Sequence, residues 1–135
     1  MNKIKTLQAV ERRGIRMSKY LLFRAKDSRP AIVKKVKKLI GYPCVVKPNE
    51  SGSSVGVTIV REEMELGPAL EKALRENSLI LVEKYIKGRE LTCGVLGNSL
   101  ETKLVALPPV EIVPPHGTFF DYHAKYFSKE TKEVC

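Results

Sequence analysis

The chain has 135 residues and a formal net charge of +9, from 24 Lys and Arg against 15 Asp and Glu. Its 43% hydrophobic residues can bury a core, which excludes a disordered tail. No apolar run approaches the roughly 20 residues that cross a bilayer, and the N-terminus lacks the apolar stretch of a secretory signal. We therefore expect a globular, cytoplasmic protein, or a large piece of one.

The first two thirds of the chain alternate helical and extended patterns. Hydrophobic spacing predicts helices over residues 2–13, 30–40 and 62–76, and strands over residues 19–24, 43–47, 57–60 and 79–85. Gly14 and Gly41 follow the first two helices, where glycine commonly ends a helix. Residues 48–56 form a Gly- and Ser-rich loop between two strands, and such a loop is usually functional or mobile.

Beyond the turn at Gly88 the patterns are extended only. They predict strands over residues 89–97, 102–107 and 110–113, separated by a Gly-Asn turn and by two prolines. From Phe119 onward the sequence is aromatic, polar and irregular. The order of elements predicts an α+β fold with largely antiparallel pairing.

The densest basic run lies in the second predicted helix. The apolar stripe of that helix is expected to comprise Ile32, Val33, Val36, Leu39 and Ile40. The lysines at positions 34, 35, 37 and 38 then occupy the opposite, solvated face. A nucleic-acid-binding patch is the alternative, but no aromatic residues interleave with these lysines as a base-stacking surface requires.

The cysteines, Cys44, Cys93 and Cys135, lie far apart in the sequence. None has the spacing of a zinc or redox motif, and the odd count argues against a disulfide scaffold. We expect buried or idle thiols. No metal-ligand set is expected within the chain.

A first candidate site combines Lys47, at the end of a predicted strand, with the following loop Gly52-Ser53-Ser54-Val55-Gly56. Lysine supplies charge, glycine lets backbone N–H groups approach phosphate oxygens, and serine hydroxyls add donors. The lysine precedes the glycines, so this is not a Walker A loop, and the GxGxxG pattern of a dinucleotide fingerprint is absent too. The pattern predicts phosphate binding, with a plain flexible turn as the alternative.

A second candidate site follows the apolar strand that ends near Val82. Glu83 and Glu90 lie on either side of the turn at Gly88. Two carboxylates near a strand end could accept hydrogen bonds from an adenine amino group and from ribose hydroxyls. They could equally belong to a solvated hairpin tip.

Taken together, the motifs VVKP, GSSVG, LVEKYIKGRELT and TFFDYHAKY resemble the ATP-grasp superfamily, and within it D-alanine–D-alanine ligases. The resemblance covers residues from about 43 to 127. It implies an ATP-grasp fold in which residues 1–90 form the small ATP-binding subdomain, with a mostly antiparallel sheet plus helices. Residues 91–135 would be the incomplete beginning of the larger subdomain, including its lid segment.

The resemblance also implies roles for residues that hold ATP. Lys47 and Lys3 would contact the phosphates, and the loop Gly52, Ser53, Ser54, Val55 and Gly56 would fold over them. The adenine would be held by Glu83 together with the backbone of Lys84, Tyr85 and Ile86, and the ribose by Glu90. In the lid, Lys125 would reach the transferred phosphate, while Ser53 and Tyr126 would help close the site over D-alanine.

The implied reaction joins two D-alanines through an acylphosphate for peptidoglycan synthesis, with ATP and Mg²⁺ in the cytoplasm. The resemblance also allows a homodimer of the full-length enzyme. The chain lacks the family's N-terminal domain and its later arginine and metal-binding segment, so we expect it to be inactive alone. Alternatives are another carboxylate–amine ligase, such as a D-alanine–D-lactate ligase, a basic nucleic-acid-binding module, and a non-catalytic subunit.

Overall fold

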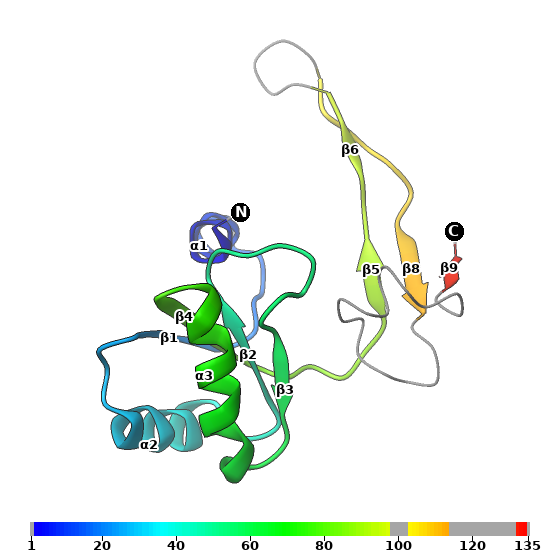
Figure 1. Cartoon of the computed structure of the whole chain (residues 1–135). Coiled ribbons are helices and arrows are strands. Elements are labelled where there is room, and N and C mark those ends of the chain that lie inside the picture. The colour runs from blue at the N-terminus through cyan, green and yellow to red at the C-terminus, as the bar shows by residue number, and fades with distance from the viewer. Residues whose placement is uncertain (1, 98–102, 114–131, 135) are drawn as a thin grey trace. The chain divides into compact units, whose positions relative to one another are not determined.

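The computed structural model describes residues 2–97, 103–113 and 132–134 of the chain. The chain divides into two compact units, Met1–Ile86 and Lys87–Cys135, each of which is described by itself (Figure 1). Among the residues that are described, no helix is long and apolar enough to cross a membrane.

The first unit is a four-stranded antiparallel sheet with helices. Its strands are β1 (Tyr20–Arg24), β2 (Cys44–Pro48), β3 (Thr58–Val60) and β4 (Leu79–Lys84), in the spatial order β1-β4-β2-β3. Its helices are α1 (Lys3–Glu11), α2 (Arg29–Leu39) and α3 (Leu66–Glu76), with a short 3₁₀ turn over Glu63–Glu65 before α3. The predicted elements of this unit are present, although the helix expected from residue 62 begins as this 3₁₀ turn.

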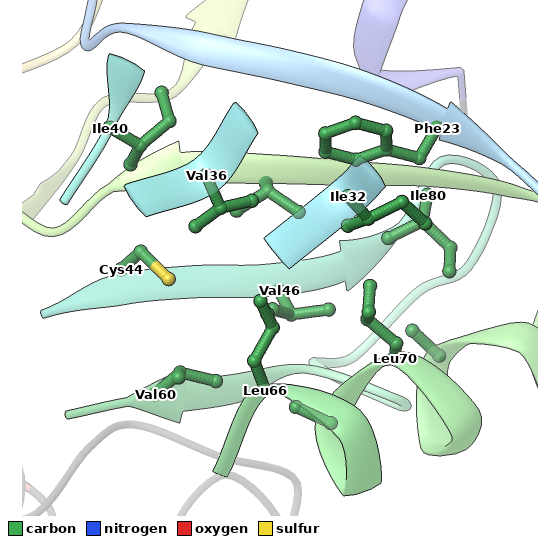
Figure 2. Packing of buried hydrophobic residues seen from close by; sticks show 13 residues of the cluster. Phe23, Ile32, Val36, Ile40, Cys44, Val46, Val60, Leu66, Leu70 and Ile80 are labelled. Atoms are coloured by element: carbon green, nitrogen blue, oxygen red, sulfur yellow. The ribbon is translucent and has the colours of Figure 1, made fainter. Parts of the chain in front are cut away.

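The core of the first unit lies between the sheet and two of its helices. Figure 2 shows Val36 of α2 and Leu70 of α3 among side chains from the strands, including Val46 of β2. Successive side chains of a strand point to opposite faces of the sheet. Cys44, Val46 and Pro48 of β2 are buried, while the residues between them are half-buried. One face of β2 therefore packs into the apolar core, and the other carries the half-buried Val45 and Lys47.

The apolar stripe predicted for α2 is correct except at Leu39. Ile32, Val36 and Ile40 recur every four residues and are buried, Val33 packs against the same core, and Leu39 is 49% exposed. Neighbouring helical residues point about 100° apart, so Leu39 turns away from the face that Ile40 buries. The lysines of the run are exposed as predicted, and Lys37 pairs with Glu63 at 2.8 Å.

The second unit consists of short antiparallel strands. These are β5 (Glu90–Thr92), β6 (Val95–Leu96), β7 (Val105–Ala106), β8 (Val110–Val113) and β9 (Lys132–Val134), in the orders β5-β8-β9 and β6-β7. Arg89 donates two hydrogen bonds to the Glu111 carboxylate, at 2.9 and 2.6 Å.

Two expectations for the second unit were wrong. The single strand predicted over residues 89–97 is two strands, because β5 pairs with β8 whereas β6 pairs with β7. The prolines Pro108 and Pro109 separate β7 from β8, as predicted, because proline cannot donate a hydrogen bond to a strand ladder. The irregular structure predicted after Phe119 is contradicted at β9, which pairs with β8. Its ladder with β8 is a long-range contact that local sequence does not encode.

Candidate functional site

Lys47 and Glu83 form an ion pair on the sheet face opposite the core. Lys47 of β2 lies opposite Leu81 of β4, and Glu83 lies opposite Val45. The two residues are therefore diagonal neighbours on the same face of adjacent strands. The Lys47 Nζ is 2.6 Å from the Glu83 Oε2, and the side chains are only 22% and 13% exposed. The pair thus places a cation and an anion in a partly dry environment.

Lys3, the first residue of α1, brings a second ammonium group to this region. Its Nζ donates to the carbonyl oxygens of Pro48 and Ser51, at 2.9 and 3.1 Å, and to the Ser51 Oγ at 3.1 Å. Burial lowers the pKa of Lys3, nearby Lys47 lowers it further, and Glu83 opposes this by raising it. Two lysine ammonium groups thus share one carboxylate, which leaves a net positive charge. A bound anion would neutralise this charge.

The loop predicted to hold phosphate has a strained backbone. Ser53 and Ser54 adopt positive φ angles of 50° and 60°, a conformation uncommon for residues other than glycine and often found at functional sites. The Ser51 Oγ donates to the Val55 carbonyl at 3.2 Å. Inside the loop, the Val55 N–H donates to the Gly52 carbonyl at 3.0 Å. The loop is therefore a folded structure rather than an open turn.

Gly56 ends this loop at a position where only glycine fits. Its φ is +73°, and a Cβ there would lie 2.9 Å from the Glu76 Cγ and 3.0 Å from the Pro48 Cγ. The proline ring cannot rotate away. By contrast, a Cβ on Gly52 would meet no atom within 4 Å.

A pocket lies further along the same sheet face. Its volume is about 330 Å³, and Pro43, Ile59, Arg61 and Tyr85 line it. Ile59 and Glu83 both pair with Val45, and strand alternation puts all three on one face. The N–H groups of Lys84 and Tyr85 are used within the fold, since they donate to the carbonyls of Lys19 and Pro43. The charged pair and the pocket therefore lie on the same face of the sheet.

The structure brings several of the predicted site residues into the first unit. Lys3, Lys47, Glu83 and the loop over 52–56 all lie there. Glu90 begins β5 in the second unit and is exposed. Lys125 and Tyr126 lie outside the described residues.

Sequence analysis missed two polar residues at the base of the loop. Ser51 gives Lys3 two of its three acceptors. Asn49 is buried at 1% exposure, and its Oδ1 accepts from the Ile4 N–H at 3.0 Å. Both belong to a polar stretch typical of a turn. Their partners lie more than 40 positions away, so no local pattern signals their roles.

Residues 9–135 match the family model described as D-ala D-ala ligase C-terminus. The chain belongs to the D-alanine–D-alanine ligase family. It is 41% identical, over its whole length, to the D-alanine–D-alanine ligase of Geobacter sulfurreducens and 40% identical to that of Syntrophobacter fumaroxidans. It spans 39% and 42% of the lengths of these two D-alanine–D-alanine ligases.

Solved structures of D-alanine–D-alanine ligase relatives have the same fold. The VanG D-Ala:D-Ser ligase from Enterococcus faecalis matches 99% of this chain with a TM-score of 0.80 and 34% identity, over 38% of its own length. The D-alanyl-alanine synthetase A from Vibrio cholerae matches 98% of this chain with a TM-score of 0.77 and 31% identity, over 40% of its own length. These matches confirm the predicted α+β, ATP-grasp fold and the family resemblance.

Proposed function

We propose that this chain supplies the nucleotide-binding part of an ATP-dependent D-alanine–D-alanine ligase. The observation that carries the proposal is the cluster of Lys3, Lys47 and Glu83 beside the strained loop over 52–56. Two ammonium groups with one carboxylate leave net positive charge in a partly buried place. A polyphosphate is the ligand that this charge and this loop fit best.

The phosphates would bind where Lys3 and Lys47 meet the loop. The lowered pKa of Lys3 results first from burial and then from Lys47, and a phosphate would counter both effects. Ser53 and Ser54 would fold over the phosphates with the loop glycines. Gly56 anchors that loop against Pro48, which keeps the backbone donors close to one place.

The base would bind toward Glu83 and the pocket. Lys84 and Tyr85 already use their N–H groups in the sheet, so base contacts from this stretch would come from carbonyl oxygens or from Ile86. Glu83 would accept from the adenine amino group, which requires it to share or release Lys47. Glu90, in the second unit, is proposed for the ribose hydroxyls on the family resemblance.

The proposed reaction transfers the terminal phosphoryl group of ATP to the carboxylate of one D-alanine. The amine of a second D-alanine then displaces phosphate to give the dipeptide. Lys125, Tyr126 and Ser53 are proposed to act at the transferred phosphate and the closing lid. Positioning and charge stabilisation supply most of such catalysis.

Mg²⁺ is part of this proposal as the ion that accompanies ATP. Among the described residues there is no group of three or more His, Cys, Asp or Glu that could hold a metal ion. The proposal therefore assigns no metal ligand to these residues. A cytoplasmic role in peptidoglycan synthesis follows from the proposed activity.

The second substrate is proposed to be D-alanine, in keeping with the names of the curated relatives. One structural relative is named as a D-Ala:D-Ser ligase. A ligase that uses another second substrate therefore remains the alternative within the same family. None of the reported comparisons favours a nucleic-acid-binding module.

Titration of the chain with ADP and with ATP, each with and without Mg²⁺, tests nucleotide binding. Heat of binding and thermal stabilisation are the measurements. Saturable stabilisation that is lost in Lys47→Ala is expected. A folded chain that neither binds nor is stabilised by either nucleotide would contradict the proposal. The exposed Lys35→Ala variant, on α2, is the matched control and should bind normally.

A further inference from the structure

Asn49 is the one polar or charged residue that is buried among those the structure describes, with 1% exposure. It follows the last residue of β2, Pro48, and its N–H donates to the Leu79 carbonyl of β4 at 2.9 Å. This bond extends the sheet by one position and fixes the Asn49 backbone. A buried polar side chain is costly unless it is hydrogen-bonded, so its partners indicate its purpose.

Those partners are the first residues of α1. The Asn49 carbonyl oxygen accepts from the Lys3 N–H at 3.1 Å, and the Asn49 Oδ1 accepts from the Ile4 N–H at 3.0 Å. The next N–H of the helix, from Lys5, is capped by the Asn2 Oδ1 at 3.0 Å. The first N–H groups of α1 are therefore occupied. An anion near the start of α1 would therefore be bound by the Lys3 side chain and not by these N–H groups.

Directional bonds are needed to aim that side chain. Ile4 is buried and attaches α1 to the unit, but hydrophobic contact is non-directional and would tolerate rotation of the helix. The two hydrogen bonds to Asn49 fix the start of α1 in both position and rotation. The Lys3 Nζ then lies at the Pro48 and Ser51 carbonyls, at the entrance of the 52–56 loop.

We propose that Asn49 is a positioning residue that holds Lys3 at the loop for contact with the phosphates of a bound nucleotide. This inference rests on the proposed function for the phosphate contact. The positioning of Lys3 by Asn49 is already present in the chain without nucleotide and does not depend on that contact. Asn49 makes no contact with the ligand in this proposal, and it acts only through Lys3.

Asn49→Leu tests the proposal, since leucine has a similar size and no side-chain acceptor for the Ile4 N–H. The backbone carbonyl that accepts from the Lys3 N–H remains. Adenosine, which lacks phosphates, and ADP serve as probes for the whole chain. The variant is expected to bind ADP roughly tenfold more weakly, as if one charge-assisted contact were lost, and to bind adenosine unchanged. Lys3→Met should lose ADP affinity similarly, and the double variant should lose little more.

Equal loss of ADP and adenosine affinity would mean a general structural role and would overturn the proposal. So would fully additive losses in the double variant. Ile4→Val is the matched control, because it weakens the attachment of α1 but keeps both hydrogen bonds. Its ADP-to-adenosine affinity ratio should equal that of the unsubstituted chain. If Asn49→Leu does not fold, Asn49→Ala removes the same side-chain acceptor with a smaller side chain.

Lysine acetylation followed by mass spectrometry separates this inference from the proposed function. Without nucleotide, Lys3 should react slowly relative to exposed Lys5, and Asn49→Leu should raise the Lys3 rate severalfold. An unchanged Lys3 rate overturns positioning by Asn49 and leaves the nucleotide proposal intact. Absence of ADP binding by the unsubstituted chain overturns the proposed function, and with it the phosphate contact of Lys3.

Discussion

Lys47 and Glu83, which the family resemblance assigns to opposite ends of a nucleotide, are in direct contact. The Lys47 Nζ lies 2.6 Å from the Glu83 Oε2, across the adjacent strands β2 and β4. Each therefore serves as the other's counterion before any ligand binds. A nucleotide would have to replace part of this pairing, with phosphate for Lys47 and an adenine amino group for Glu83.

Lys47→Ala should weaken ADP binding by roughly 1.5–3 kcal/mol, the value of a hydrogen bond to a charged group. The variant also leaves Glu83 without its cation in a partly buried place, which adds repulsion toward phosphate. Isothermal titration calorimetry measures the change. Unaltered ADP affinity would show that Lys47 makes no phosphate contact, and Lys35→Ala on the solvated face of α2 is the control.

Glu83→Gln should favour tripolyphosphate over ADP. It removes the carboxylate that competes for Lys47, so tripolyphosphate, which has no base, should bind more tightly by on the order of 1 kcal/mol. ADP should gain less, or lose affinity, because the neutral amide oxygen of glutamine is a weaker acceptor for the adenine amino group than the carboxylate. Competition titrations measure both. Tripolyphosphate binding that stays the same or weakens would exclude competition between Glu83 and the anion.

Gly56→Ala should lower the free energy of unfolding by about 1–3 kcal/mol. The alanine would have to adopt a φ of +73°, and its Cβ would lie 3.0 Å from the Pro48 Cγ and 2.9 Å from the Glu76 Cγ. Gly52→Ala is the matched control, since no atom lies within 4 Å of its Cβ position, and it should change stability by less than about 0.5 kcal/mol. Urea unfolding measures both, and equal effects would refute the packing role of Gly56.

Stability should fall between pH 9 and 11 because of Cys44. Burial raises the pKa of this thiol from 9.0 to about 11, and Lys84 partly opposes the shift. Below pH 9 the folded and unfolded states both keep the neutral thiol. Above it the unfolded state ionises first, and the free energy of unfolding should drop by on the order of 2–3 kcal/mol once the pH passes 11.

Urea unfolding at several alkaline pH values, compared with Cys44→Ala, isolates this contribution. The variant is less stable at every pH, but its stability should decline less steeply across the same interval. Parallel declines would contradict the assignment to Cys44. Iodoacetamide should label exposed Cys93 in the folded chain much faster than buried Cys44.

Nucleotide binding should take up protons at alkaline pH through Lys3. In the chain without ligand the pKa of Lys3 lies below 10.5, mainly because of burial and then because of Lys47. Phosphate would raise that pKa, so more Lys3 is protonated in the complex at pH values near the lowered one. No uptake by Lys3 is expected near neutral pH, where the ammonium is charged in both states.

Calorimetry in two buffers of different ionisation enthalpy measures the proton uptake. Lys3→Met should abolish the part due to Lys3 and should also weaken ADP binding. Uptake that persists at full size in Lys3→Met would assign the effect to another group. Lys5→Met changes an exposed lysine on the same helix and is the control.

The sequence by itself determined the elements of the first unit and the family. Helix and strand patterns are local, so the spacing of Ile32 and Val36 indicated the buried face of α2 directly. Short motifs also singled out Lys47, Glu83 and the loop as candidate site residues, and their roles stay a prediction. Leu39 was wrongly assigned to the buried face of α2. Ile32, Val36 and Ile40, spaced four residues apart, already fill that face.

Only the tertiary structure decided which of these residues meet. Lys3 reaches Ser51, and Asn49 reaches Ile4, through strand and helix packing that joins segments more than 40 positions apart. The ion pair of Lys47 and Glu83 depends on the register of β2 against β4. Register and helix docking are set by the packing of the whole unit, which no local pattern contains.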